Sequence, residues 1–254
     1  MTAARDRSVW PALTAAAWRH GAAHLVLVDP DRTDPARARN LGRECAEAGV
    51  DGLLFGSSTP FTRDPAPVLE ALREATRLPI VLFPGSAAQL RRDVDAVLFL
   101  SLLSGRDPRF LIEEQTKAAP RVLEWGLEPI PVGYLLIGPA EGGSVERVTG
   151  TAPLGEADAD AIARHAQAAA CLGMAAVYLE RGSGAASPLP PALVRAVAAA
   201  TPVPTIAGGG IRRPEDAGAL AAAGARFLVT GTAHEEGRPV RPFTEAIHGA
   251  LVPA

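Results

Sequence analysis

The stretch Val203–Gly210 has the sequence VPTIAGGG and is followed directly by IRRPED. A similar stretch, RFLVTGTA, occupies Arg226–Ala233. Two short apolar runs each end in glycine, and a helix-like segment follows each run. A continuous apolar run is typical of a strand buried in a parallel sheet. Glycines at the end of such a strand let backbone N–H groups approach an anion, and the next helix N-terminus adds a partial positive charge. The pair therefore predicts the phosphate site after the last two strands of a (β/α)8 barrel, although tight strand–helix turns would use the same residues.

Six apolar runs upstream have the same character, which gives eight expected strands. These are His24–Asp29, Asp51–Phe55, Pro79–Phe83, Ala96–Leu100, Pro129–Ile137, Ala175–Glu180, Val203–Ala207 and Arg226–Thr230. The expected helices are Asp34–Ala48, Pro65–Arg77, Pro108–Leu123, Glu156–Leu172, Leu189–Ala200, Pro214–Ala223 and Arg241–Leu251. This alternation predicts an α/β fold with a closed parallel sheet. Because Pro84–Asp95 is short, we expect the third helix to be reduced to a loop or short turn, and we expect glycine-rich Gly138–Gly155 to be a long loop.

Length and composition agree with one barrel domain over residues 1–254. Hydrophobic residues make up 48% of the chain and the net charge is −3, so no footprint for nucleic acid is present. The apolar runs are too short to span a bilayer, and the charged N-terminus lacks a signal-peptide core, which predicts a cytoplasmic protein. Cys45 and Cys171 are expected to be reduced thiols in the core, and no metal-ligand spacing of Cys or His stands out.

Two carboxylates follow expected strands at the barrel end where chemistry occurs in this fold. Asp29 ends the first strand, and with a nearby hydroxyl such as Ser58 it could hold Mg2+ on a diphosphate, since Mg2+ prefers oxygen ligands. The alternative is that Asp29 only caps the following turn. Asp31 is expected to face water.

Glu180 ends the sixth strand, and Tyr178, two residues earlier, points to the same face. The flanking Val177 and Leu179 should then face the helices. A glutamate that points into a barrel mouth is costly unless it is paired or catalytic, so Glu180 is a candidate general base on a substrate hydroxyl. The alternative is a rim glutamate paired with Arg181 or Arg212.

The ordered motifs of the chain resemble the geranylgeranylglyceryl phosphate synthase family. They are VLVDPD at 26–31, FGSST at 55–59, LFPGS at 82–86, LFLSLLSGRDPRF at 98–110, EPIPVGYLLI at 128–137, GMAAVYLERGSGA at 173–185, AGGGIRRPEDA at 207–217 and LVTGTAHEE at 228–236. The resemblance implies a modified TIM barrel with one helix reduced. It also implies Mg2+-dependent transfer of a polyprenyl group, geranylgeranyl in the family's name, from its diphosphate to sn-glycerol 1-phosphate, which forms an ether lipid precursor. Members of the family form dimers and larger assemblies, so a homo-oligomer is expected.

The resemblance also assigns roles to residues of this chain. Asp29 and Ser58 match the metal positions, and Glu180 and Tyr178 match the catalytic ones. The segment that holds the glycerol phosphate comprises Tyr178, Leu179, Glu180, Arg181, Gly182, Ser183 and Gly184. The phosphate cradle comprises Gly208, Gly209, Gly210, Gly231 and Thr232.

Two departures from the family pattern keep other readings open. Glu113-Glu114-Gln115 replaces a Gly-Ala-Gln found in many members. The two carboxylates would change the charge near the diphosphate or the prenyl entrance if they faced it, but we expect them on a solvated helix face. Arg181 replaces an alanine and could bind a second anion, which keeps 3-phosphoglycerate, the acceptor of the moenomycin-type branch, as the alternative to the favoured glycerol 1-phosphate.

A phosphate-sugar isomerase or synthase barrel is another alternative, although the fifth strand offers no obvious acid–base partner. A non-catalytic phospholipid-binding barrel is the last, and the intact Asp29 and Glu180 argue against it.

Overall fold

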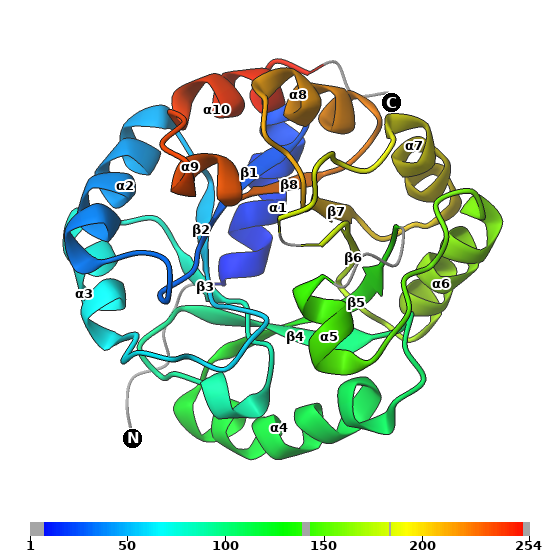
Figure 1. The fold of residues 1–254 in the computed structure, drawn as a ribbon, viewed down its shortest axis with the longest axis horizontal. Helices are drawn as coiled ribbons and strands as arrows, with labels where there is room; N and C mark the ends of the chain where they lie inside the picture. Colours follow the sequence, from blue (N-terminus) through cyan, green and yellow to red (C-terminus); the bar gives the residue numbers. More distant parts are fainter. Residues whose placement is uncertain (1–7, 139–142, 183, 251–254) are drawn as a thin grey trace.

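Eight parallel strands close into a barrel, in the order of the chain. The computed structural model describes residues 8–138, 143–182 and 184–250. The strands are β1 Ala23–Val28, β2 Gly52–Phe55, β3 Ile80–Leu82, β4 Ala96–Leu102, β5 Glu128–Leu136, β6 Ala176–Glu180, β7 Thr205–Gly208 and β8 Phe227–Thr230. Each strand pairs with the next, and β8 returns to β1, where Ala23 lies opposite Phe227. The predicted TIM barrel is therefore confirmed (Figure 1).

A ring of helices covers the outside of the barrel (Figure 1). The ring helices are α2 Pro35–Ala48, α3 Ala66–Ala75, α4 Glu114–Trp125, α6 Ala159–Cys171, α7 Pro191–Ala200, α8 Pro214–Ala222 and α10 Arg241–His248. Local sequence sets their ends: the Asp34 carboxylate accepts from Arg37 N at 2.8 Å, and Pro35 occupies the first turn of α2. Between β3 and β4 stands only the short helix η1, Ala87–Gln89, as the short segment predicted.

Side chains alternate between the barrel interior and the helix layer. In β6, Val177 and Leu179 pack in the cluster that contains Ile162 of α6 and Val194 of α7. Tyr178 belongs instead to the interior cluster. The expected two faces of this strand are thus confirmed, and of its last residues Tyr178 and Glu180 line the cavity at the barrel mouth.

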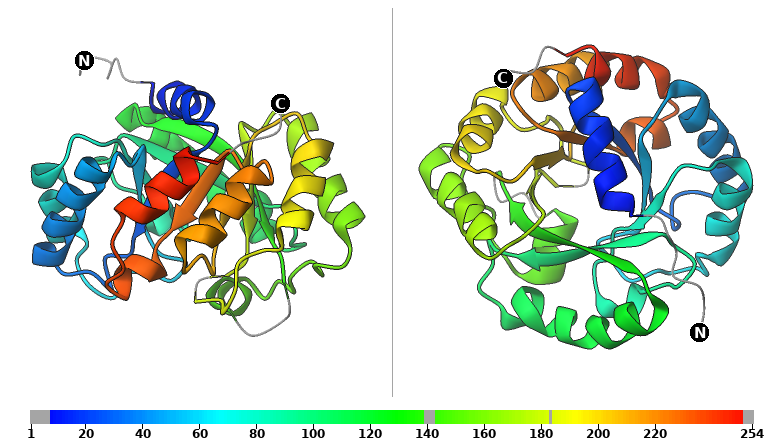
Figure 2. Two further views of the ribbon diagram at one scale, coloured as in Figure 1. Left: turned by 90° about the horizontal axis from the view of Figure 1, so that it is seen from above. Right: turned by 180° about the vertical axis from the view of Figure 1, so that it is seen from behind.

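Three helices were not predicted, two of them short. Helix α5, Ser144–Thr149, lies inside the segment expected to be a loop, and α9, Thr232–Glu235, follows β8 directly. Helix α1, Val9–His20, precedes the barrel and covers its N-terminal end (Figure 2, right). The buried residues of α1 are Val9, Leu13 and Ala17, and Trp10 stacks on Phe227 with ring centroids 4.9 Å apart.

The two cysteines differ in exposure. Cys45 is buried in α2, and burial raises the pKa of its thiol well above the usual value. Cys171 is exposed at the end of α6, so the expectation that both thiols lie in the core was wrong for this residue. No helix in the described ranges is long and apolar enough to cross a membrane.

Helix α1 is capped by a residue from another element. Its own N-cap residue, Ser8, makes no capping hydrogen bond with its side chain. The Glu128 carboxylate at the start of β5 accepts instead from the backbone N–H groups of Val9 and Trp10, the latter at 3.0 Å. One ionised side chain therefore satisfies two helix-end donors and fastens α1 to the barrel.

Replacing Glu128 should weaken this attachment. We expect Glu128→Ala to lower the free energy of unfolding by about 1–2 kcal/mol, as for loss of a charged helix cap. The matched control is Glu124→Ala, which removes an exposed carboxylate from α4. Denaturant unfolding of both variants measures the difference, and equal stabilities would contradict the capping role.

Candidate active site

A cavity of about 390 Å³ opens at the C-terminal ends of the strands. Its wall is polar on the side of β1, β2 and β6 to β8, where Asp29, Ser58, Glu180 and Gly209 line it. On the side of β4 its wall is apolar, with Phe99, Leu100, Leu102 and Phe110. One cavity therefore offers an anion-binding half and a hydrophobic half.

Glu180 is the buried acid of this cavity, with 5% of its surface exposed. Its Oε1 accepts from Gly182 N at 2.7 Å, and the hydroxyls of Tyr134 and Tyr178 also hydrogen-bond to the carboxylate. Burial raises the pKa of Glu180, and these hydrogen bonds oppose the rise. A buried carboxyl that lines a cavity and has a perturbed pKa is a candidate for proton transfer.

The alternative pairing of Glu180 with an arginine is wrong. Arg181 forms its ion pair with Glu156 and donates to Ser187 O, and Arg212 pairs with Glu236. Arg181 is absent from the cavity lining, and its side chain is largely buried. The Arg181 charge is thus neutralised away from the cavity.

Tyr134 was missed in the sequence. It lies opposite Tyr178 in the β5–β6 register, and their ring centroids are 5.2 Å apart. Phe83 stacks on Tyr178 at 5.3 Å, which packs three rings beneath the carboxylate. The fifth strand therefore supplies a partner for Glu180 after all, as a hydrogen-bond donor. The sequence alone does not show that Tyr134 lies beside Tyr178, because this depends on how β5 and β6 pair.

The glycine cluster after β7 has no room for side chains. A Cβ on Gly208 would collide with the Tyr178 hydroxyl, and a Cβ on Gly209 would lie 2.8 Å from the backbone N and O of Gly182. Gly209 and Gly210 also have φ of +86° and +69°, which L side chains rarely adopt. Both line the cavity, so backbone approaches it directly.

The remaining predicted substrate-binding positions divide into three groups. Gly231 and Thr232 line the cavity beside the glycine cluster. Gly182 and Gly184 have φ of +109° and +80° in the loop after β6, and Ser183 lies outside the described residues. Leu179 points away from the cavity into the helix layer, so only its backbone lies near the site.

Asp29 and Ser58 follow the neighbouring strands β1 and β2, and both line the cavity. Asp29 Oδ1 accepts from Asp31 N at 2.9 Å, and Arg32 Nε lies 3.8 Å from its Oδ2. Burial raises the pKa of Asp29, while hydrogen bonds from Asp31 N and the Ser57 hydroxyl oppose the rise. Ser58 Oγ donates to Ser144 Oγ of α5 at 2.8 Å. Ser57 is a further hydroxyl of this edge that the sequence analysis did not single out.

Two expectations about charged residues near this edge were wrong. Asp31 does not simply face water: its carboxylate accepts from Thr62 N, Thr62 Oγ1 and Arg63 N, so it holds the loop after β2. Glu114 does not lie on a solvated helix face, because it lines the cavity and accepts from Ala87 N at 2.8 Å.

Gln115, the residue after Glu114, also lies in the cavity wall. Gln115 donates from its amide to Leu100 O and Phe110 O. Of the two carboxylates expected on a solvated face, only Glu113 is exposed. Glu114 and Gln115 thus fasten α4 to η1 and to the end of β4.

The chain matches the PcrB family over residues 14–248. It belongs to the PcrB family. Among curated relatives, a geranylgeranylglyceryl phosphate synthase from Thermofilum pendens is 44% identical over 223 residues, which cover 87% of this chain and 86% of the relative. A protein of the same name from Methanopyrus kandleri is 46% identical over 213 residues, 84% of this chain and 88% of the relative.

Solved structures extend the similarity to the whole barrel. A crystal structure of (S)-3-O-geranylgeranylglyceryl phosphate synthase from Thermoplasma acidophilum, in complex with sn-glycerol-1-phosphate, aligns with a TM-score of 0.89 and 32% identity, covering 96% of this chain and 99% of that one. The synthase from Thermoplasma volcanium aligns with a TM-score of 0.84 and 32% identity, covering 94% and 96%.

The raised pKa of Glu180 predicts a pH-dependent cost to stability. In the folded protein this carboxyl ionises at higher pH than in the unfolded chain, so ionisation costs stability as pH rises through the folded-state pKa. Below the usual glutamate pKa both states are protonated and the cost vanishes. We therefore expect Glu180→Gln to gain stability relative to the wild type as pH rises.

Thermal unfolding of both proteins from about pH 4 to pH 8 measures this difference, because that range begins near the usual glutamate pKa and extends in the direction of the shift. The control is Glu113→Gln, at an exposed position of the same chain, which should leave the difference flat. A Glu180→Gln variant that loses stability relative to the wild type with rising pH would contradict the assignment.

Proposed function

We propose that this protein transfers a polyprenyl group, geranylgeranyl in the first instance, from its diphosphate to the free primary hydroxyl of sn-glycerol 1-phosphate. The observation that carries the proposal is Glu180, a buried acid of raised pKa between a glycine-built backbone cradle and an apolar wall. The sequence identity to curated geranylgeranylglyceryl phosphate synthases supports it. The product is a glycerol ether that carries the prenyl chain.

The acceptor phosphate fits the end of the cavity formed by β7 and β8. Backbone groups of Gly209, Gly210 and Gly231 line it there, with the first turn of α9 at Thr232. Backbone N–H groups and a hydroxyl are suitable donors to a phosphate. The hydroxyl of a three-carbon acceptor held there reaches toward Glu180 and Tyr178, which is consistent with the sn-glycerol-1-phosphate bound to the relative from Thermoplasma acidophilum.

In the reaction, the acceptor oxygen forms a bond to C1 of the prenyl group while the bond from C1 to the diphosphate oxygen breaks. Glu180 accepts the proton of the attacking hydroxyl, and diphosphate leaves with the bonding electron pair. Tyr134, Tyr178 and Gly182 N hold the carboxylate toward that hydroxyl. Their hydrogen bonds also counter the rise in the pKa of Glu180, which keeps it available as a base.

The donor diphosphate fits the neighbouring edge formed by the ends of β1 and β2. Asp29 offers a partly buried carboxylate, and Ser57 and Ser58 offer hydroxyls, which is the oxygen-rich set that Mg2+ prefers. We therefore assign Asp29 and Ser58 to a Mg2+ site, and the ion, when bound, would neutralise charge on the departing diphosphate. The prenyl chain fits the apolar wall from Phe99 to Phe110, where each buried CH2 contributes about 0.8 kcal/mol.

The alternatives find less support. Recognition of the carboxylate of 3-phosphoglycerate needs a free cation, and Arg181 is occupied by Glu156. An aldose–ketose isomerase has no use for an apolar wall of this extent beside its acid–base pair. The cytoplasmic location and the homo-oligomer stay predictions of the sequence.

Glu180→Gln tests the proposed chemistry. The change keeps the shape and removes the base, so we expect transfer from geranylgeranyl diphosphate to glycerol 1-phosphate to slow by roughly 10²–10⁴-fold. The affinity for glycerol 1-phosphate should stay near the wild-type value. A labelled-donor assay with glycerol 1-phosphate, glycerol 3-phosphate and 3-phosphoglycerate measures both rate and acceptor choice. Wild-type protein that transfers to none of these acceptors would refute the proposal.

Asp29→Asn tests the donor edge. Loss of the carboxylate should abolish most turnover and raise the Mg2+ concentration needed for what remains, while binding of glycerol 1-phosphate persists. Asp34→Asn is the matched control, because asparagine caps the start of α2 about as well as aspartate. An Asp29→Asn variant with wild-type turnover at limiting Mg2+ would exclude Asp29 as a ligand.

A further inference from the structure

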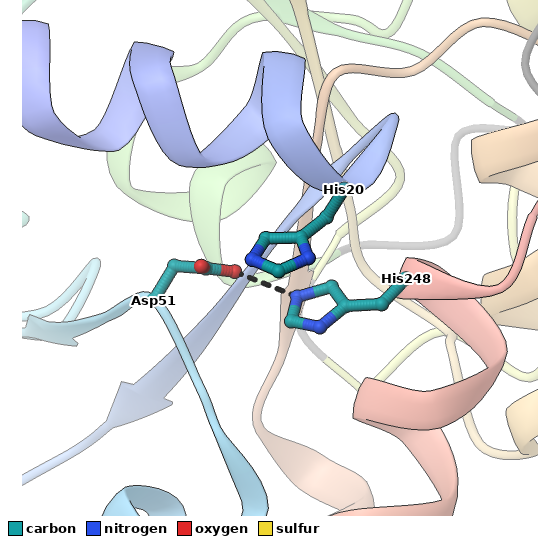
Figure 3. A group of neighbouring side chains, drawn as sticks. All are labelled: His20, Asp51 and His248. Carbon is teal, nitrogen blue, oxygen red and sulfur yellow. Dashed lines mark hydrogen bonds and ion pairs between the residues drawn. The ribbon is translucent and has the colours of Figure 1, made fainter.

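Two histidines and an aspartate meet at the end of the barrel opposite the active site (Figure 3). His20 is the last residue of α1, Asp51 directly precedes β2, and His248 is the last residue of α10. One ligand atom from each lies within 4.8 Å of the other two. Three elements that are far apart in the sequence thus bring three potential metal ligands to one point.

The three side chains are partly ordered by contacts already in place. His248 Nε2 lies 2.9 Å from Asp51 Oδ2, and the two histidine rings stack with centroids 4.1 Å apart and planes 11° apart. Asp51 Oδ2 also accepts from His24 N at 2.8 Å. A backbone donor to a ligating carboxylate is the kind of outer contact that fixes a ligand in protein metal sites.

His20 is the adjustable member of the group. Its ring stacks on His248 and makes no hydrogen bond within the described part of the chain. A nitrogen lone pair lies in the plane of its ring, so two stacked rings direct their lone pairs side by side and one ring must turn to share an ion. Turning His20 breaks only the stack, and closing the ligand atoms to the spacing of a tetrahedral zinc site, about 3.3 Å, is a small movement.

We propose that His20, Asp51 and His248 form a second metal site, which binds Zn2+ or a similar borderline divalent ion with water as the fourth ligand. Two imidazoles and one carboxylate match zinc chemistry. They do not match Mg2+ or Ca2+, which require several oxygen ligands.

The consequence of such a site is mechanical. His20 and His248 end the first helix and the last ring helix, so an ion bound to both ties α1 to α10 under the barrel. An ion that binds the folded chain and not the unfolded one stabilises the fold by mass action. The site lies away from the cavity of Asp29 and Glu180, so its occupation is independent of the proposed transfer reaction.

Metal-free full-length protein, titrated with ZnCl2, tests the proposal. We expect one zinc ion to bind per chain in calorimetry, and a Tm rise of about 5–10 °C at zinc near 100-fold above its dissociation constant. His20→Gln and His248→Gln should each abolish the zinc-induced rise. The comparison uses the change on adding zinc, because His248→Gln also removes a hydrogen bond present without metal.

Two control variants separate this site from other zinc ligands. His165→Gln removes a partly exposed histidine on α6, and Cys171→Ser removes the exposed thiol, so both should keep the full zinc response. Cobalt bound by the wild type should give the visible absorption of a four-coordinate ion, lost in both site variants. No zinc-induced Tm rise in the wild type, or an equal rise in His20→Gln and His248→Gln, would overturn the proposal.

Discussion

The arrangement of the candidate active site depends on the hydrogen bonds that hold the Glu180 carboxylate. Its partners in the described chain are the N–H of Gly182 and the hydroxyls of Tyr134 and Tyr178. These donors require β5, β6 and β7 to be in close contact, and the Tyr178 hydroxyl occupies the space where a Cβ of Gly208 would lie. The absence of side chains in the glycine cluster therefore has two effects: it exposes backbone at the cavity wall, where we propose that the phosphate binds, and it makes room for the tyrosine hydroxyl bonded to Glu180.

Such a carboxylate is expensive for the fold. Burial raises the pKa of Glu180, and the two arginines considered as its partners, Arg181 and Arg212, form ion pairs with Glu156 and Glu236 instead. A cation beside Glu180 would lower its pKa and stabilise the fold, but it would also weaken the carboxylate as a base. Because both arginines pair with other carboxylates, Glu180 keeps its raised pKa at a cost to the stability of the fold, as is common in active sites.

The strands and the glycine-built cradle could be predicted from the sequence, because buried parallel strands are short apolar runs and their ends carry the functional residues. Tyr134 was missed because its role comes from pairing opposite Tyr178. Glu114 was misplaced because a π-helical turn, Arg109–Glu113, precedes α4, and its wider spacing rotates the following residues toward the cavity. Helix α1 was missed because no strand precedes it, so the strand–helix alternation gave no reason to expect it.

The two ends of the barrel differ: the C-terminal end holds an open cavity, and helix α1 packs over the N-terminal end. Loops at the C-terminal ends of the strands must leave a cavity open for two substrates, so they contribute little packing. The opposite end is closed by Val9, Leu13 and Ala17 against the interior, and Glu128 and Trp10 fix the helix that carries them. His20, Asp51 and His248 lie at the end of that same helix. Close packing and helix-end contacts are thus concentrated at the end of the barrel away from the cavity, the end where conserved features of this fold serve stability.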